Sequence, residues 1–351
     1  MGGMGSGTPM PVLFMNKIDI ENPEELLTYL KQSHRISPTE QFQIHNLRGG
    51  VSNKTVLVKR PTGVSWVLKQ ALPKLRVDVD WFSDPARIHC EALALQHLPQ
   101  LAPPGTITPL IFEDRDQNLL AMAAVPDPHN NLKTLFLSHH IVEDHLYQFG
   151  RLIGSIHLKS TSRPDLHTLF EDRSFFESLR IEPYYRYTAQ QLPQAADALH
   201  QIIEMTYSRR LCLVHGDYSP KNILVHEGKL ILLDHEVIHF GDPAFDIGFA
   251  LAHLLSKAHH IPAYRERFIS AAHLFWTSYT TTIAPAPWSI DIDTHAAAHG
   301  IACLLARVAG RSKLEYLSAE ERMHQQEITL NLLAHRPTSV LQLIDRFVAE
   351  L

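Results

Sequence analysis

The sequence predicts an α+β protein of two lobes, a small lobe around an antiparallel β-sheet and a larger lobe that is mainly helical. Three observations lead to this fold class. Short β-prone runs, separated by glycine and proline turns, fill the stretch between Pro38 and Val125. Beyond Val125 the apolar residues recur with the 3.6-residue period of helices. A few short apolar runs of strand type interrupt that helical part.

The small lobe is predicted to begin with a helix. Asn22 is a capping residue, a proline and two glutamates follow it, and Leu26, Leu27 and Leu30 form one apolar face. The other elements of this lobe are expected as strands at 42–47, 55–59 and 65–70, a helix at 85–98, and strands near 107–113 and 118–124.

The second lobe is predicted from longer periodic segments. Helices are expected at 139–158, 189–207, 246–257, 261–281, 293–309 and 319–334, and strand-type runs at 211–214, 223–225 and 230–233. The change of period divides the chain into a flexible tail (residues 1–20), an N-terminal lobe (21–125) and a C-terminal lobe (126–351). A cleft between two lobes is a usual place for a ligand.

Bulk properties narrow the classes of partner. A formal charge of −5 gives no electrostatic reason to expect nucleic acid or an acidic membrane as a partner. Cys90, Cys212 and Cys303 are too widely spaced for a zinc cluster or a disulfide framework. The N-terminus lacks the pattern of a signal peptide, and no apolar run is long enough to span a membrane. We expect a cytoplasmic protein, a monomer or a homodimer.

The most specific stretch is Leu213-Val-His-Gly-Asp-Tyr-Ser-Pro-Lys-Asn-Ile-Leu-Val. His215 precedes Asp217 by two positions, and Asn222 follows Asp217 after four residues, which is the spacing of a kinase catalytic loop. Asp217 would meet the hydroxyl that accepts a phosphoryl group, while Asn222 would reach a metal on the phosphates. The alternative is a polar turn of a β-hairpin, which Pro220 and Lys221 would suit.

Two acids after the last strand-type run suggest a metal site. Asp234 directly follows the apolar run that ends at Leu233, and its carboxylate would complete the coordination of Mg²⁺, which prefers oxygen ligands. Glu236, two residues on, would support a second ion. In the alternative interpretation, Asp234 only begins a turn.

The small lobe supplies candidates for binding a nucleotide. Lys69 ends a strand and Glu91 lies on the following helix, an arrangement that presents a positive charge to phosphates. Lys69 alone could also be a solvated strand end. The turn at Gly49 and Gly50, with Ser52 after it, would let backbone N–H groups approach phosphate, and Ala124 at the lobe boundary completes the set: Lys69, Glu91, Gly49, Gly50, Ser52 and Ala124.

These motifs, with Phe240-Gly-Asp-Pro-Ala-Phe-Asp-Ile-Gly, resemble the aminoglycoside phosphotransferase and choline kinase family over roughly residues 40–320. The resemblance implies a bilobal protein-kinase-like fold, ATP and Mg²⁺, Asp217 as catalytic base, and Asn222 with Asp234 as metal ligands. It also implies that Asp246 holds the catalytic loop by hydrogen bonds. On this basis the N-terminal lobe is expected to bind the nucleotide and the C-terminal lobe the second substrate.

Within that family, Leu68-Lys-Gln-Ala-Leu-Pro and the segment from Asp80 to Leu93 resemble the small lobe of methylthioribose kinases. The resemblance implies that Trp81 covers the cleft. The chain departs from those kinases at Asp234-His-Glu, where they usually have Asp-Pro-Glu. Their substrate-clamping arginine pair has no clear counterpart, because Arg209 and Arg210 precede the catalytic loop.

The sequence therefore predicts an ATP- and Mg²⁺-dependent phosphotransferase acting on a hydroxyl of a small molecule of sugar, aminoglycoside or amino-alcohol type, with a methylthioribose-like sugar among the options. A nucleotide-binding regulatory protein without turnover and a metal-dependent hydrolase are the alternatives. Arg307 and Arg311 would contact an anionic acceptor or pair with acids such as Glu315.

Overall fold

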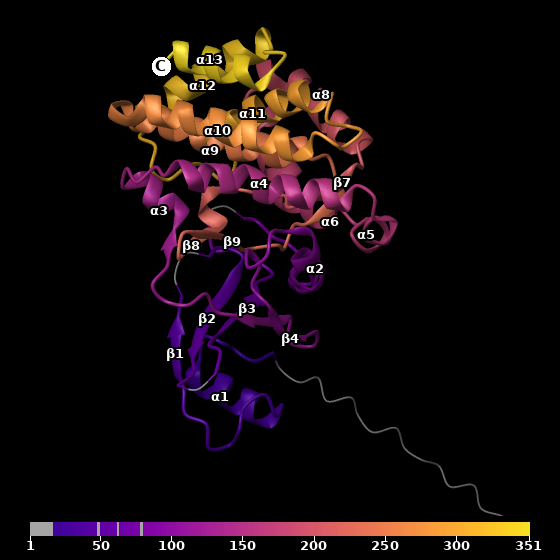
Figure 1. The fold of residues 1–351 in the computed structure, drawn as a ribbon, viewed down its shortest axis with the longest axis vertical. Coiled ribbons are helices and arrows are strands. Elements are labelled where there is room, and N and C mark those ends of the chain that lie inside the picture. Colours follow the sequence, from indigo (N-terminus) through magenta and orange to yellow (C-terminus); the bar gives the residue numbers. More distant parts are fainter. Residues whose placement is uncertain (1–16, 48–49, 62, 78–79) are drawn as a thin grey trace, which may run out of the picture.

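The computed structural model describes residues 17–47, 50–61, 63–77 and 80–351. Figure 1 shows a sheet-containing lobe at the bottom and a stack of long helices above it, so the predicted two-lobed α+β class is confirmed. The predicted boundary near Val125 falls between the last strand of the sheet and the first element of the helical lobe.

The small lobe is built on a five-stranded antiparallel sheet with the strand order β1-β2-β3-β5-β4. Its elements are α1 (Pro23–Gln32), β1 (Gln43–Asn46), β2 (Asn53–Lys59), β3 (Trp66–Ala71), α2 (Arg87–Leu101), β4 (Leu110–Asp114) and β5 (Leu119–Ala123). Side chains of a strand alternate between the faces of the sheet. Trp66 and Leu68 therefore share a core with α1, while Ala71 belongs to the core that includes α2.

The N-terminal segment is ordered earlier than the sequence predicted. Asn22 caps α1 by accepting hydrogen bonds from the backbone N–H groups of Glu24 and Glu25. Ile18 and Ile20 were expected in the flexible tail, but Ile20 is fully buried and the Ile18 N–H donates to Gln117 at 2.9 Å. Burial of these apolar side chains against the sheet is the reason for the difference.

The second lobe begins with β6 and ends with α13. Its elements are β6 (Asn130–Asn131), α3 (Leu132–Leu137), α4 (Glu143–Ser160), α5 (Pro164–Leu169), α6 (Ser174–Phe176), a π-helix (Glu177–Arg186), α7 (Tyr187–Gln191), a 3₁₀ turn (Pro193–Ala195), α8 (Ala196–Ser208), β7 (Cys212–Val214), a 3₁₀ turn (Pro220–Asn222), β8 (Ile223–His226), β9 (Lys229–Leu232), β10 (His239–Gly241), α9 (Ala244–His260), a 3₁₀ turn (Pro262–Tyr264), α10 (Arg265–Ile283), α11 (Ile292–Ala309), α12 (Ala319–Ala334) and α13 (Val340–Ala349).

Two of the differences from the expected helices have a clear physical cause. The helix predicted at 189–207 is broken into α7 and α8, because Pro193 cannot donate the backbone hydrogen bond that a continuous helix needs. The sequence analysis missed α13, whose start is capped by the Ser339 side chain and whose buried face carries Leu343, Ile344 and Phe347.

Close helix pairs form the core of the helical lobe. Gly248 on α9 faces α11, where a Cβ atom added to it would lie 2.5 Å from the carbonyl carbon of His299 and 2.6 Å from the backbone nitrogen of Gly300. The absence of a side chain at Gly248 therefore lets the two backbones approach. This pairing fixes the position of α9, which runs directly behind the catalytic loop.

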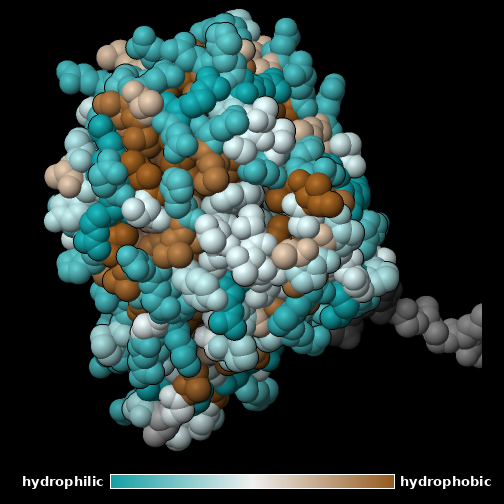
Figure 2. All heavy atoms as spheres, turned by 45° about the horizontal axis from the view of Figure 1, so that its top comes forward, coloured by the Kyte–Doolittle hydropathy of each residue, from teal (hydrophilic) through white to brown (hydrophobic). Residues whose placement is uncertain are grey.

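The surface gives no single dominant apolar area on the face drawn in Figure 2. Hydrophilic side chains cover most of it, and hydrophobic ones form separate patches. The large apolar residues that are most exposed, such as Ile290, Met323 and Phe82, come from distant parts of the chain. Among the described residues, none of the helices combines the length and the apolar character needed to span a membrane.

Gly248→Ala is expected to lower the free energy of unfolding by about 1–3 kcal/mol. The new methyl group overpacks the α9–α11 contact, and this cost exceeds the gain in helix propensity from glycine to alanine. Urea denaturation measures this change. Gly50→Ala is the control, since its Cβ would meet its nearest atom at an ordinary 3.6 Å. Equal stability of the two variants would contradict the close approach.

Candidate active site

A buried ion pair joins the sheet to α2. On β3, Lys69 lies on the same face as Ala71, toward α2, and the Lys69 Nζ donates to Glu91 Oε1 at 2.7 Å. Glu91 is fully buried on the inner face of α2. The strand period and the helix period together bring the two predicted residues into contact.

Lys69 also reaches across to the second lobe. Its Nζ donates to Asp234 Oδ1 at 2.8 Å, so one ammonium group bridges two carboxylates from different lobes. Burial by itself would lower the pKa of Lys69, but the charges of Asp234 and Glu91 outweigh it and raise that pKa. Burial likewise favours a higher pKa for Asp234, yet Lys69 and Lys221 hold it below the usual range. Lys69 is therefore a fixed cation beside an ionised Asp234.

The loop that the sequence predicts to be catalytic, with Asp217 and Asn222, lies between β7 and β8. Asn222 Nδ2 donates to the Asp217 carbonyl oxygen at 3.0 Å and to Asp217 Oδ2 at 2.7 Å. The Asp217 N–H donates to His215 Nδ1 at 3.2 Å. These bonds aim the side chains of Asp217 and Asn222 from one short loop.

Asp246 holds this loop from behind, as the resemblance implied. Its two oxygens accept the backbone N–H groups of His215 at 2.7 Å and Gly216 at 2.8 Å, and His157 Nε2 lies 3.2 Å away. Burial would raise the pKa of Asp246, but these hydrogen bonds outweigh it and lower that pKa. Gly216 has a φ of +76°, and a Cβ there would lie 2.9 Å from the Val237 carbonyl oxygen, so glycine is required at this turn.

The β8–β9 hairpin places the two predicted metal ligands side by side. The Leu233 N–H donates to the Asn222 carbonyl oxygen at 2.9 Å, and Asp234 is the next residue. Asn222 donates hydrogen bonds from its side-chain amide N–H groups to Asp217, which leaves the Asn222 Oδ1 available to coordinate a metal ion. Asp234 is partly exposed, with a side-chain exposure of 22%. An amide oxygen and a carboxylate next to each other fit a Mg²⁺ ion whose other ligands come from phosphates and water.

Glu236 has a different environment from that of Asp234. Its Oε2 accepts hydrogen bonds from Asn53 Nδ2 at 2.9 Å and Arg87 Nε at 3.1 Å. Arg87 is fully buried and also donates to the carbonyl oxygens of Ser52, Leu72, Ser83 and Asp84. The pair thus ties the second lobe to the loops of the small lobe. Binding of a second ion by Glu236 stays a prediction.

The other predicted nucleotide contacts lie around the turn before β2 and at the end of β5. Ser52 is buried, and its carbonyl oxygen is held by Arg87 and by the Leu72 N–H at 3.0 Å. Gly50 is exposed, and Gly49 lies outside the described residues. Ala124 follows β5, and its N–H donates to the Ser65 carbonyl oxygen at 2.8 Å. Their roles toward a nucleotide stay predictions.

Sequence reasoning missed the cation that faces Asp217. Arg180, on the π-helix, forms an ion pair with Asp217 Oδ1 at 2.8 Å and donates to the Gly216 carbonyl oxygen at 2.7 Å. Its side chain is only 9% exposed. Arg173 and Arg186 lie nearby in the sequence, and no motif marks Arg180 as the one that meets Asp217.

Trp81, Arg209 and Arg311, which the sequence analysis also considered, each contact a group in the second lobe. Trp81 is buried and donates from Nε1 to the Ser178 carbonyl oxygen at 3.0 Å, so it joins the small lobe to the π-helix. Arg209 lies 3.2 Å from Asp242 Oδ2. Arg311 pairs with Glu182 at 3.1 Å rather than with Glu315.

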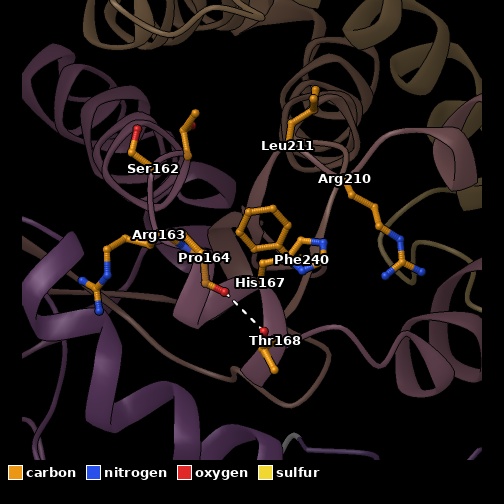
Figure 3. A pocket seen from close by; sticks show the side chains of 9 residues that line it. Ser162, Arg163, Pro164, His167, Thr168, Arg210, Leu211 and Phe240 are labelled. Atoms are coloured by element: carbon orange, nitrogen blue, oxygen red, sulfur yellow. Dashed lines mark hydrogen bonds between the residues drawn. The ribbon is translucent and has the colours of Figure 1, made fainter.

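A hollow that lies apart from these residues is drawn in Figure 3. Its lining includes residues 161–163 between α4 and α5, Pro164 and His167 on α5, and Phe240 on β10. The guanidinium groups of Arg163 and Arg210 point away from each other on opposite sides, and Arg163 pairs with Asp165 at 2.6 Å. The hollow has none of the predicted site residues, and we assign it no role.

Arg87→Met is expected to lower the free energy of unfolding by about 3–5 kcal/mol, because it leaves the Glu236 carboxylate buried without its counter-charge. The double variant Arg87→Met/Glu236→Leu should recover part of that loss. Urea denaturation measures both, with Arg115→Met as the control, since the Arg115 side chain is 73% exposed. A loss below about 1 kcal/mol would contradict the proposed importance of the pair.

Comparisons with known proteins show the family of this chain. A model described as the phosphotransferase enzyme family (APH) matches residues 43–282. The methylthioribose kinase of Pectobacterium carotovorum is 24% identical over 340 residues, covering 84% of this chain and 83% of that protein. That of Klebsiella pneumoniae is 26% identical over 283 residues, covering 69% of each chain.

Solved structures share the fold. A choline kinase from Cryptosporidium parvum has a TM-score of 0.54 at 11% identity, covering 90% of this chain and 97% of its own. A macrolide 2'-phosphotransferase from Brachybacterium faecium has a TM-score of 0.51 at 15% identity, covering 90% and 99%. The family match runs from β1 into α10 and includes the catalytic loop, so this protein belongs to the phosphotransferase enzyme family.

Proposed function

We propose that this phosphotransferase moves the γ-phosphate of ATP to a hydroxyl group of a small molecule in a Mg²⁺-dependent reaction. The observation that carries the proposal is the bridge of Lys69 between Glu91 and Asp234, set beside the Asp217–Asn222 pair. Phosphoryl transfer needs a cation for the phosphates, ligands for a metal ion and a base. Lys69, the Asn222–Asp234 pair and Asp217 would supply these three groups.

The roles of the residues follow from their contacts. Lys69, fixed by Glu91, would bind phosphate oxygens, and Asn222 with Asp234 would hold Mg²⁺. When bound there, the ion neutralises charge on the phosphates. Asp217 orients the acceptor hydroxyl and takes its proton as the new oxygen–phosphorus bond forms and the bond to the ADP oxygen breaks. Positioning and neutralisation of charge supply most of the rate enhancement.

The acceptor is proposed to be a sugar, an aminoglycoside or an amino alcohol. Similarity to methylthioribose kinases supports a sugar of that kind, and it extends over most of this chain. The wall next to Asp217 is formed by Arg180 and Tyr184 on the π-helix, which supports an acceptor position beside that element.

Asp217→Asn is expected to reduce acceptor-dependent ADP formation by about 10²–10⁴-fold, because an amide cannot take the hydroxyl proton. Binding of Mg-ATP, followed as a thermal shift, should persist. The assay screens sugars, methylthioribose, aminoglycosides, choline analogues and amino alcohols. Asp197→Asn, an exposed residue of α8, is the matched control. Retained turnover in Asp217→Asn would show that another group is the base.

Mg-ATP is expected to raise the melting temperature more than Mg²⁺ alone, since only the nucleotide engages both lobes and binding stabilises the folded state. A hydrolase that uses the same carboxylates would show no such difference. A regulatory protein would show the shift without ADP formation in the acceptor screen. Thermal-shift and ADP measurements on the same preparation distinguish the three cases.

A further inference from the structure

One face of α9 leads from the catalytic loop into the helical lobe. Asp246, Phe249, His253 and Lys257 follow at spacings of three or four residues and therefore share that face. The Arg180 guanidinium lies 5.9 Å from the centre of the Phe249 ring. Because a helix rises about 1.5 Å per residue, Lys257 is about 12 Å along the axis from Phe249.

A second buried arginine extends the same wall. Arg307 Nη1 donates to the Tyr184 hydroxyl at 2.9 Å and to Ser312 Oγ at 2.8 Å. Tyr184 stands between two guanidinium groups, with Arg180 at 5.7 Å and Arg307 at 5.6 Å from the ring centre. The Arg307 Nε is buried and has no hydrogen-bond partner among the described residues.

Lys257 is a third basic side chain, and it is fully buried. Its Nζ donates to the His253 carbonyl oxygen at 3.0 Å and lies 5.1 Å from the centre of the Tyr316 ring. The Tyr316 hydroxyl is also buried without a partner in the described part of the chain. Buried lysines and arginines are normally paired, because an unpaired charge inside a protein is costly.

The described residues supply no carboxylate within 4 Å of Lys257 or Arg307. Glu315, whose charge acts on Lys257, is ion-paired with Lys133. Burial and then the charge of Lys133 lower the pKa of Lys257 to about 7. Burial and the charges of Arg307, Lys257, Lys133 and Lys221 lower the pKa of His253 well below its usual range.

On the basis of the proposed function, we propose that the acceptor carries a carboxylate or phosphate group, in addition to its hydroxyl, and that Lys257 and Arg307 bind this anionic group. The acceptor class is then a hydroxy acid or a sugar phosphate. Its hydroxyl lies at Asp217, beside Arg180, and its anionic group lies toward the Lys257 end of α9.

The physical reason is the missing counter-charge: burial lowers the pKa of Lys257 to about 7, and an anion beside it would favour the protonated form. A bound carboxylate or phosphate would supply the counter-charge that Lys257 lacks and accept a hydrogen bond from the Arg307 Nε. A cationic acceptor such as an aminoglycoside would meet Arg180, Arg307 and Lys257 along its path, and like charges in a buried site are repelled strongly. The wall therefore narrows the acceptors proposed above to anionic sugars and hydroxy acids, and it disfavours the aminoglycoside and amino-alcohol options.

The test compares matched hydroxyl compounds that differ in charge. Ribose is the neutral member, ribonate carries a carboxylate, ribose 5-phosphate carries a phosphate, and glucosamine carries an ammonium group. We expect kcat/KM for ribonate or ribose 5-phosphate to exceed that for ribose by about ten-fold or more, and glucosamine to be the poorest, since a hydrogen bond to a charged group contributes about that factor. The better of the two anions identifies the group.

Binding is measured separately by calorimetric titration of ribonate and ribose 5-phosphate into protein saturated with Mg-AMP-PNP, which occupies the nucleotide site. Lys257→Met and Arg307→Met should each weaken binding of the preferred anion by about ten-fold to a hundred-fold. Arg311→Met is the matched control, because Arg311 pairs with Glu182. Lys257→Met keeps the test valid if Arg307→Met fails to fold.

The outcomes separate this inference from the function on which it rests. Anion binding that depends on Lys257 supports the inference even if no ADP forms. The absence of ADP formation would then count against the phosphotransferase proposal alone. ADP formation that is as fast with ribose or glucosamine as with the anions overturns the inference and leaves the phosphotransferase proposal standing. Absence of anion binding, or binding unchanged in Lys257→Met, also overturns the inference.

Discussion

A single buried carboxylate organises the active site. Asp246 accepts two backbone N–H groups of the catalytic loop and lies next to His157 of α4, so α4, α9 and the loop are joined at one point. The glycine that this geometry requires, Gly216, in turn presents its carbonyl oxygen to Arg180. The orientation of Asp217 depends on this set of bonds, because Asp217 directly follows Gly216.

The two lobes meet through charges as well as apolar contacts. Lys69 reaches Asp234, Arg87 reaches Glu236, and Trp81 donates to the π-helix. Separating a buried ion pair leaves an unpaired charge, which is costly. These contacts therefore hold the small lobe in a defined position relative to the catalytic loop. Farther from the loop the wall is basic. It carries Arg180 on the π-helix, Arg307 on α11 and Lys257 on α9. Acidic groups surround the predicted metal position, and basic groups line the proposed acceptor wall.

Sequence patterns predicted the catalytic core because it consists of short motifs. The spacing of Asp217 and Asn222 depends on one loop, and the position of Asp234 depends on the strand before it, so local sequence is sufficient for both. The contact of Lys69 with Glu91 was predictable from the order of strand and helix. The environment of Glu236 was not predictable, because Asn53 on β2 and Arg87 on α2 come from distant segments that only the tertiary fold brings to it.

By itself, the sequence determined the two-lobed α+β class, the position of the loop that carries Asp217 and Asn222, the helix cap at Asn22 and most of the long helices. Each of these rests on periodicity or on residues close together in the chain. The tertiary structure decided that Ile18 and Ile20 belong to the core, that Arg180 faces Asp217, and that Lys257 and Arg307 are buried without carboxylate partners among the described residues. Those facts depend on packing between segments far apart in sequence, and no local pattern encodes which charge will meet which partner.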